Sequence, residues 1–356
     1  MAPTRDVAIV SFAQSTHRRA VPELNEVEMI QPVIHAALDG IGAKIADIGF
    51  TCSGSSDYLA GQAFSFVMTL DAVGAYPPIQ ESHVEMDGAW ALYEAWLKIQ
   101  AGHADTALVY GYSKASPGDL PRVLSRQLDP YYYGPLWPDS VALAGLQARA
   151  MIDAGLITED EMAAIAHRSR EAARGNPHAQ VQGSDPIDQL LAAPYLSDPL
   201  RKHDVAPISD GGAAIILATG DKAREWAENP AWIRGIDHRI DSHNIGARDL
   251  TTSPSTKLAG EKAGVANGAV DVAELCAPFT HQEKILTTAL GLGDDTVVNP
   301  SGGALAANPV MGAGLIRLGE VANRIMSGEA GRGVAHATSG HLLQQNLVAV
   351  LEGANS

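Results

Sequence analysis

The chain has few cysteines, a deficit of positive charge and no long apolar run. Cys52 and Cys276 are its only cysteines, too few for a disulfide scaffold or a cysteine zinc site. Lys and Arg number 25 against 41 Asp and Glu, a formal net charge of −16. That charge argues against nucleic acid or an anionic membrane as the main partner, although local cations could still hold an anionic cofactor. The start, MAPTRDVAIVSFAQ, has no apolar leader, and no stretch is long enough to span a bilayer. We therefore expect a cytoplasmic protein without membrane insertion.

The remaining composition is that of a folded globular chain. Hydrophobic residues make up 46% of the sequence and charged residues 19%, which excludes intrinsic disorder. A length of 356 residues allows one large domain or two of ordinary size.

Strand and helix patterns alternate twice along the chain, which predicts two α/β units with mixed sheets. Between the units, the proline-rich stretch 117–207 carries two amphipathic helical patterns, at 140–154 and 158–174, and is expected to be an inserted lobe. We accordingly divide the chain into 1–116, the lobe 117–207, a closing strand in 208–220, and 221–356. The expected strands are 5–14, 47–58, 105–113, 209–219, 231–241, 270–279, 333–340 and 346–353. The expected helices are 28–42, 88–101, 253–264, 280–293 and the later part of 299–326.

Two helix starts carry capping signals. Asp87 precedes the helix predicted from Gly88, where a carboxylate suits the positive end of the helix dipole. Thr280 and Glu283 have the spacing of a capping box.

Five stretches, taken in order, resemble the thiolase superfamily, most closely its sterol-carrier thiolase or lipid-transfer-protein branch. They are LAAPYLSDPLRKHDVAPISDGGAA (191–214), SDGGAAIILAT (209–219), DVAELCAPFTHQEKILTTALGL (271–292), NPSGGALAANPVMGAG (299–314) and GVAHATSGHLLQQNLVAVLEG (333–353). The resemblance covers essentially the whole chain. It implies two similar βαβαβαββ halves in a five-layer αβαβα sandwich with an inserted loop lobe. It also implies a homodimer, or a heterodimer with a second thiolase-like chain, through edge strands of the first half near 82–88 and 105–113.

The chain departs from the family at all three catalytic positions. Residues 85–88 read EMDG where the family has Cys-Ala-Ser/Thr-Gly, and 308–310 read NPV where it has Gly-His-Pro. The C-terminal cysteine loop becomes TSGH at 338–341. A carboxylate cannot replace the thiolate without forming a reactive anhydride, so thiolase activity is not expected.

Retro-aldol cleavage needs no nucleophile, and the resembled branch includes aldolases that shorten steroid side chains. The resemblance therefore implies a lyase on a tertiary β-hydroxyacyl-CoA, acting with a small OB-fold partner that carries a zinc ribbon. No cofactor is expected in this chain, because CoA enters as the substrate's thioester and any zinc would belong to the partner. The alternative is a non-catalytic subunit that pairs with an active thiolase-like chain, or an acyl-CoA or lipid-binding protein.

Glu85, Cys276 and His341 stand at or beside positions where the family places catalytic groups. We expect them to line one cleft, with Glu85 and His341 handling the hydroxyl and enolate protons. Glu85 has the alternative of a helix-dipole partner, and Cys276 that of a small core residue. Asp87 and His281 are further catalytic candidates; their alternatives are an N-cap and an ordinary place in a first helical turn.

Binding candidates come from three loops. Gly302 and Gly303 would let backbone approach the pantetheine thioester, or simply turn the chain. Ser339 and Gly340 share a loop with His341, whereas His336 is expected to be structural. Tyr132, within the tyrosine cluster 131–133, is expected to shape an apolar pocket. Aldolases of the branch are thought to use tyrosines, yet the last tyrosine here is Tyr195. The candidate cations for CoA phosphates, otherwise solvated surface charges, are Lys114, Arg122, Arg126, Arg201 and Lys202.

Overall fold

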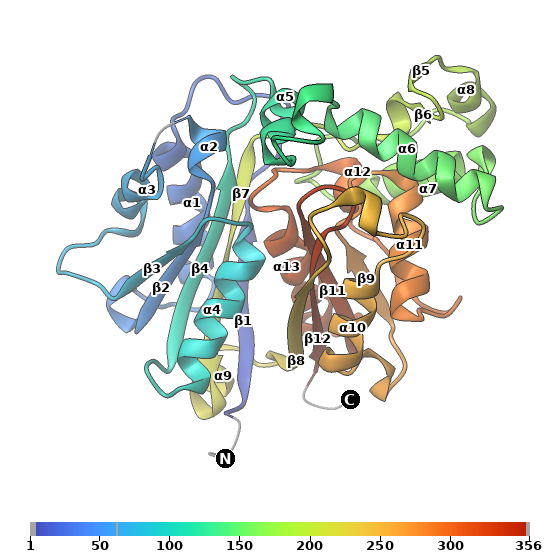
Figure 1. The fold of residues 1–356 in the computed structure, drawn as a ribbon. Coiled ribbons are helices and arrows are strands. Elements are labelled where there is room, and N and C mark those ends of the chain that lie inside the picture. The colour runs from blue at the N-terminus through green and yellow to red at the C-terminus, as the bar shows by residue number, and fades with distance from the viewer. Residues whose placement is uncertain (1–4, 62, 354–356) are drawn as a thin grey trace.

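The computed structural model describes residues 5–61 and 63–353, and its largest element is a ten-stranded sheet (Figure 1). Each half of the chain contributes five strands. From one edge to the other the strands are β10 (Val297–Val298), β9 (Val272–Leu275), β11 (Arg332–Ser339), β12 (Gln345–Glu352), β8 (Ala231–Ile240), β1 (Val7–Gln14), β7 (Gly211–Thr219), β4 (Thr106–Ser113), β2 (Phe50–Gly54) and β3 (Glu81–Val84).

The two five-stranded sheets that the sequence predicts are joined along one seam. Ala8 pairs with Trp232 and Ile9 with Ala231, so β1 and β8 run antiparallel side by side. The short pairing leaves each half free to turn its own inner face toward the central helices.

The helices and the two halves of the sheet form the five expected layers. Helices α4 (Gly88–Gln100) and α13 (Ala313–Met326) share one apolar core with strands of both halves (Figure 1). On the outer face of the first half, a second core forms beneath α1 (Glu26–Asp39), α3 (Phe66–Val73) and α9 (Gly220–Trp226). On the outer face of the second half, α10 (Pro254–Ala263) and α11 (Thr280–Leu290) cover a third core. The αβαβα prediction is confirmed.

The segment between β4 and β7 is mostly helical and lies over one end of the sandwich (Figure 1). Its helices α6 (Ser140–Asp153) and α7 (Glu159–Ala172) confirm the two amphipathic patterns and add Ala144, Met151 and Met162 to the core of the second half. The remaining elements of the segment are α5 (Leu120–Leu124), α8 (Ile187–Ala192), β5 (Tyr195–Ser197) and β6 (Leu200–Arg201). Two short helices complete the fold, α2 (Asp57–Ala60) and α12 (Gly303–Ala306). None of the helices in the described ranges is long and apolar enough to cross a membrane.

One capping prediction is confirmed and the other is wrong. Asp87 caps α4 by accepting a hydrogen bond from the Ala89 amide. Thr280, by contrast, is already the first helical residue of α11, and its hydroxyl donates to Asp204 at 2.8 Å. Glu283 accepts from Asn299 at 2.7 Å, so distant partners outcompete the local capping box.

The expected edge strand is also placed differently. The segment predicted at 105–113 is β4, which lies between β2 and β7 and therefore has no free edge. The free edge of the first half is β3, a half-buried strand that runs directly into the start of α4. Any strand-to-strand association of the first half must use β3.

Three glycines bring the central elements into direct contact. The Gly88 amide donates to the Met311 carbonyl at 2.9 Å, which ties the start of α4 to the loop before α13. A Cβ added at Gly111 of β4 would lie 2.7 Å from that same carbonyl and 3.0 Å from the Gly88 Cα. At Gly54 of β2, an added Cβ would lie 2.5 Å from the Gly88 nitrogen. Side chains are therefore excluded where the two halves meet.

Gly111→Ala should lower the free energy of unfolding by about 1–3 kcal/mol, because the methyl group overpacks against rigid backbone. Gly293→Ala is the matched control, since an added Cβ there meets nothing within 4 Å; it should change stability by less than about 0.5 kcal/mol. Urea unfolding of both variants measures the difference. Equal stability of the two variants would contradict the close approach.

Candidate active site

A buried pocket of about 280 Å³ lies between the two halves, beneath the lobe. Its walls come from segments far apart in the sequence, and it holds both apolar and polar side chains. The lining residues are Tyr58, Asp87, Leu120, Pro121, Leu124, Gln127, Ser140, Val141, Val205 to Ile208, Cys276, Pro278, Phe279, Gln282, Asn308, Val310, Met311 and Thr338 to Leu343.

Asp87 joins the two central helices at the wall of this pocket. Its Oδ1 accepts from the amides of Ala89 (2.8 Å) and Leu315 (3.0 Å), and its Oδ2 accepts from Gly314 at 2.9 Å. One carboxylate therefore satisfies amide groups at the starts of both α4 and α13. Burial raises the pKa of Asp87 to about 6, while the three amides and Arg317 oppose that rise.

Cys276 follows β9 and also lines the pocket, but its thiol is protonated. Burial, followed by the charge of Asp87, raises the pKa of Cys276 to about 12. Since only the thiolate is an effective nucleophile, Cys276 is unsuited to forming a thioester intermediate.

His341 also lines the pocket, in a backbone turn with three left-handed residues. Gly340, Leu342 and Leu343 have φ of 72°, 59° and 57°, an arrangement that costs free energy at the two leucines. The Nε2 of His341 donates to the Leu124 carbonyl at 3.0 Å, and burial lowers the pKa of the imidazole. The ring is therefore neutral at pH 7, and its Nδ1 carries the free lone pair.

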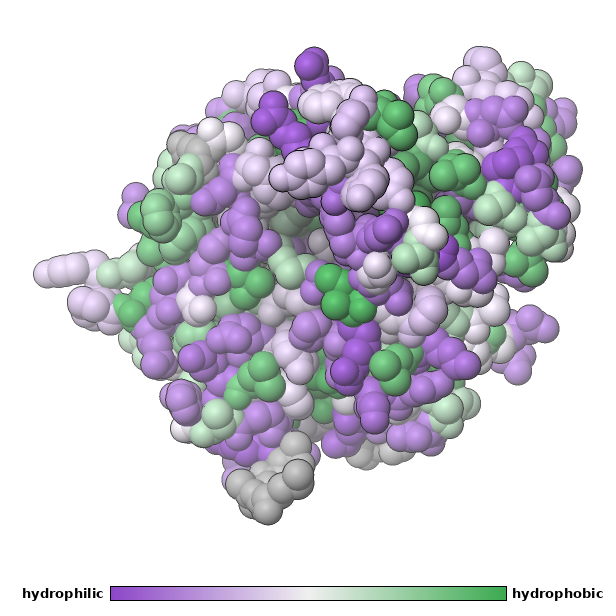
Figure 2. Space-filling view, in the orientation of Figure 1, coloured by the Kyte–Doolittle hydropathy of each residue, from purple (hydrophilic) through white to green (hydrophobic). Residues whose placement is uncertain are grey.

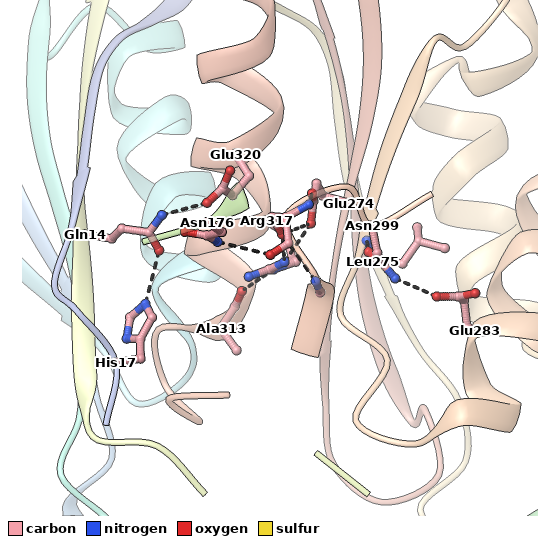
Figure 3. A network of polar contacts seen from close by, with 12 residues as sticks. Gln14, His17, Asn176, Glu274, Leu275, Glu283, Asn299, Ala313, Arg317 and Glu320 are labelled. Carbon is pink, nitrogen blue, oxygen red and sulfur yellow. Dashed lines mark hydrogen bonds and ion pairs between the residues drawn. The ribbon is translucent and has the colours of Figure 1, made fainter. Parts of the chain in front are cut away.

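A buried ion pair, which is not part of the pocket lining, joins α13 to β9 (Figure 3). Arg317 of α13 contacts Glu274 of β9 at 2.6 Å and donates to the Ser301 hydroxyl at 2.7 Å. The Ser301 amide donates to Glu274 at 2.9 Å, so both partners are well satisfied. The positive charge of Arg317 favours the ionised forms of Asp87 and Cys276, although burial outweighs it at both residues.

Of the predicted site residues, the structure brings together Asp87, Cys276, Ser339, Gly340 and His341. Glu85 is not among the lining residues. Its carboxylate accepts from the Ser56 hydroxyl (2.9 Å) and the Asp57 amide (2.6 Å), at the start of α2, and its side chain is 46% exposed. The expectation that Glu85 shares the cleft with Cys276 and His341 is therefore corrected, because the bonds to α2 hold the side chain elsewhere.

His281 lies outside the pocket, in the first turn of α11. It is fully buried, and its Nε2 lies 3.1 Å from Gln147 of α6. Burial lowers its pKa to about 3, so it is a neutral contact between two helices. His336 is similarly buried in β11, with its Nε2 3.0 Å from Asn346.

The glycine pair and Tyr132 are also absent from the pocket wall. An added Cβ at Gly302 would lie 2.6 Å from the Cβ of Ala173, and one at Gly303 would lie 2.8 Å from Asn299. Both glycines have positive φ, so they turn the chain into α12 and let it pack beside α7. Tyr132 is 77% exposed on the lobe.

Sequence reasoning missed four polar residues of the wall: Tyr58, Gln127, Ser140 and Gln282. Tyr58 accepts a hydrogen bond from Gln127, and burial raises its pKa to about 12. A signal was present, because Tyr58 ends the turn that follows the second predicted strand, where functional side chains commonly gather. It supplies the pocket with a tyrosine.

A second hollow, of about 900 Å³, shares the segment Val205–Ile208 with the pocket. It contains the cations Arg19, Arg170, Arg174 and Lys202, opposed by Asp185. Of the cations predicted for phosphates, Lys202 is the member that lies here. Arg201 instead pairs with Glu159 at 2.5 Å, and Lys114 donates to the Leu24 carbonyl. Within the described ranges, no group of three His, Cys, Asp or Glu side chains is placed to hold a metal ion.

No family model matches the chain. An acetyl-CoA acetyltransferase of Methanothermobacter thermautotrophicus is 26% identical over 361 residues, covering 92% of each chain. Human sterol carrier protein 2 is 27% identical over 296 residues, covering 69% of this chain and 52% of that protein. Among solved structures, the Ltp2-ChsH2(DUF35) aldolase matches with a TM-score of 0.80 at 18% identity, over 99% of both chains. Human mitochondrial 3-ketoacyl-CoA thiolase matches with a TM-score of 0.78 at 15% identity, over 98% of this chain and 99% of that one.

These similarities and the five-layer sandwich define a thiolase fold. In sequence, the chain is similar to acetyl-CoA acetyltransferases and to sterol-carrier proteins, at 26–28% identity.

The raised pKa of Asp87 predicts that the stability of the protein depends on pH. Its folded pKa of about 6 lies above the usual unfolded value of about 3.9, so the folded state holds the proton more tightly. As pH rises from 4 to 7, ionisation of Asp87 should remove about 2–3 kcal/mol of stability. The Asp87→Asn variant lacks this titration, so the stability of wild type relative to the variant should fall over that range.

Urea unfolding at pH 4, 5, 6 and 7 measures this difference. Asp139→Asn removes the charge at the N-cap of α6 but keeps a side chain that can cap the helix, so it controls for the loss of a capping carboxylate. A difference between wild type and Asp87→Asn that does not change with pH would contradict the burial of a titrating carboxyl group.

Proposed function

We propose that this chain is an acyl-CoA aldol lyase that cleaves a tertiary β-hydroxyacyl-CoA, with a steroid or branched side chain, into a ketone and a shortened acyl-CoA. The supporting observation is a pocket that holds a neutral histidine and a buried carboxyl group, while its cysteine is protonated. Acid–base chemistry is available there, and nucleophilic acyl transfer is not.

The reaction follows from the placement of these groups. The Nδ1 of His341 accepts the proton of the β-hydroxyl group. The Cα–Cβ bond then breaks, the hydroxyl carbon becomes the ketone, and the bonding electron pair moves into the enolate of the thioester. The enolate takes up the proton from His341 at Cα, which restores the neutral imidazole. Asn308, on the pocket wall, is the candidate hydrogen-bond donor for the enolate oxygen.

The second hollow offers a place for the CoA nucleotide. Its cations suit phosphate groups, and the segment Val205–Ile208 borders both spaces. An acyl-CoA could therefore extend from the arginine-lined hollow into the pocket. This arrangement supports a CoA thioester as the substrate on a chain that is acidic overall.

The names of the similar proteins point in two directions. The solved neighbour is an aldolase assembled from Ltp2 and ChsH2(DUF35), whereas the archaeal relatives are named acetyl-CoA acetyltransferases. The protonated Cys276 and the sequence EMDG at 85–88 favour the aldolase. We extend the proposal to a small OB-fold partner with a zinc ribbon, to a cytoplasmic location, and to a dimer formed through β3.

One observation favours a second candidate, a non-catalytic subunit that pairs with an active thiolase-like chain. The carboxylate of Asp87 occupies amide donors at the starts of both central helices. Those donors are therefore not free to stabilise a substrate oxyanion. The lyase assay below separates the two candidates.

His341→Ala should lower the rate of ketone formation by on the order of a hundredfold or more, because it removes the proton acceptor. The matched control is Glu85→Gln, outside the pocket, which should stay within about threefold of wild type if Glu85 only caps α2. The assay follows ketone and shortened acyl-CoA from a tertiary β-hydroxyacyl-CoA, with the partner present. Thermal unfolding checks that both variants are folded.

The same assay decides the prediction that Glu85 is the base. A loss in Glu85→Gln as large as that in His341→Ala would restore Glu85 to the mechanism. No turnover by wild type, with the partner bound, would favour the non-catalytic subunit.

Acetoacetyl-CoA with free CoA should give no thiolysis above background, since the thiol in the pocket stays protonated. The disappearance of the 3-ketoacyl-CoA enolate absorbance measures this. Thiolysis by wild type that is absent from mock purifications would overturn the assignment, and Cys276→Ser would then show whether Cys276 or another group carries the acyl chain.

A further inference from the structure

A loop of the lobe, residues 129–138, holds its backbone rigid and presents aromatic side chains to solvent. Asp129 accepts hydrogen bonds from the amides of Tyr131 (2.9 Å) and Tyr132 (2.7 Å). Tyr133 turns inward, donates to Asn244 at 2.7 Å and accepts from the Gly246 amide at 3.0 Å. Tyr131 and Tyr132 remain 83% and 77% exposed. The two rings are exposed because hydrogen bonds to Asp129 and Tyr133 hold the backbone of the loop in this conformation.

The end of this loop is strained and also exposes large side chains. Trp137 has a φ of 49°, a left-handed conformation that costs a bulky residue free energy. Leu136 before it is 75% exposed. The Arg122 guanidinium lies over the Trp137 ring, 5.6 Å from its centroid. Such strain and exposure are expected where a surface is shaped for binding.

The acidic and basic side chains around the loop differ in whether they have partners. Asp119, Asp129 and Asp139 all accept from backbone amides and cap local turns. Arg122 and Arg126, by contrast, form no ion pair with any residue in the described ranges. A chain with a net charge of −16 thus presents unpaired cations beside exposed aromatic rings.

This surface borders the opening of the active-site pocket. Leu120, Leu124 and Gln127, from the segment just before the loop, belong to the pocket wall. Figure 1 places α5 at the top of the molecule, away from β3, and Figure 2 shows side chains of intermediate hydropathy gathered over that region. A chain bound here would cover the pocket and leave the β3 edge free for a second copy.

We infer that residues 129–138, with Arg122 and Arg126, form the docking surface for the small OB-fold partner, which meets it with an apolar and acidic face. The inference rests on the proposed function, since it assigns a place to that partner. Tyr, Trp and Arg are the residue types that most often dominate binding energy at interfaces. The solved neighbour, an aldolase assembled with ChsH2(DUF35), covers 99% of this chain, which supports a partner of that kind.

The test measures binding directly, apart from turnover. The probe is the purified ChsH2(DUF35) chain of the solved neighbour, titrated into this 356-residue chain by calorimetry. The double variant Tyr131→Ser, Tyr132→Ser should weaken Kd by roughly thirtyfold or more. Arg126→Glu should slow association, most strongly at low salt. Tyr76→Ser, which removes a tyrosine that is 93% exposed elsewhere, should bind as wild type does.

Each outcome decides the docking proposal. Unchanged binding by the double variant, or no binding by wild type, overturns it. A double variant that loses self-association instead assigns the surface to a second copy and also overturns it. If wild type binds, the double variant does not, and neither cleaves substrate, the docking surface stands and the proposed lyase activity fails.

Discussion

The position of the pocket depends on the carboxylate of Asp87. It receives amide groups from the starts of α4 and α13, which come from different halves of the chain. The bond from Gly88 to the Met311 carbonyl runs beside it. Because the starts of both central helices are bonded to the same carboxylate, neither helix can shift along its axis without losing a buried hydrogen bond. This junction fixes the place of Met311, and of the loop that carries it, in the pocket wall.

Burying that carboxylate is tolerable because three backbone amides donate to it and, to a lesser degree, because a cation lies nearby. Arg317 interacts electrostatically with Asp87, while its direct partners are Glu274 and Ser301 (Figure 3). The ion pair is not part of the pocket lining, so the titratable groups there include a neutral imidazole, a neutral thiol and the carboxyl group of Asp87. A site of this kind can exchange protons near neutral pH. It lacks the paired thiolate and imidazolium that acyl transfer by cysteine requires.

Much of the architecture could be predicted, because strand and helix periodicities are local properties of the sequence. Asp87 as a cap is equally local, and it is confirmed. Glu85 shows where such reasoning ends: two residues before Asp87, its side chain leaves the pocket because Ser56 and Asp57 offer donors in another direction. The capping box at Thr280 fails for the same reason, since Asp204 and Asn299 arrive from distant segments. Which side chains line the pocket depends on contacts between distant segments, and the spacing of residues in the sequence does not predict those contacts.

His341 and the aromatic loop are linked through one short helix. The Nε2 of His341 donates to the Leu124 carbonyl at the end of α5, while Arg122 in the same helix lies over Trp137. The bond to Leu124 selects the tautomer of His341 and leaves Nδ1 unprotonated. Both ends of the link are strained, at Leu342 and Leu343 on one side and at Trp137 on the other. A partner that holds the loop would therefore also hold α5, and through it the lone pair on which the proposed proton transfer depends.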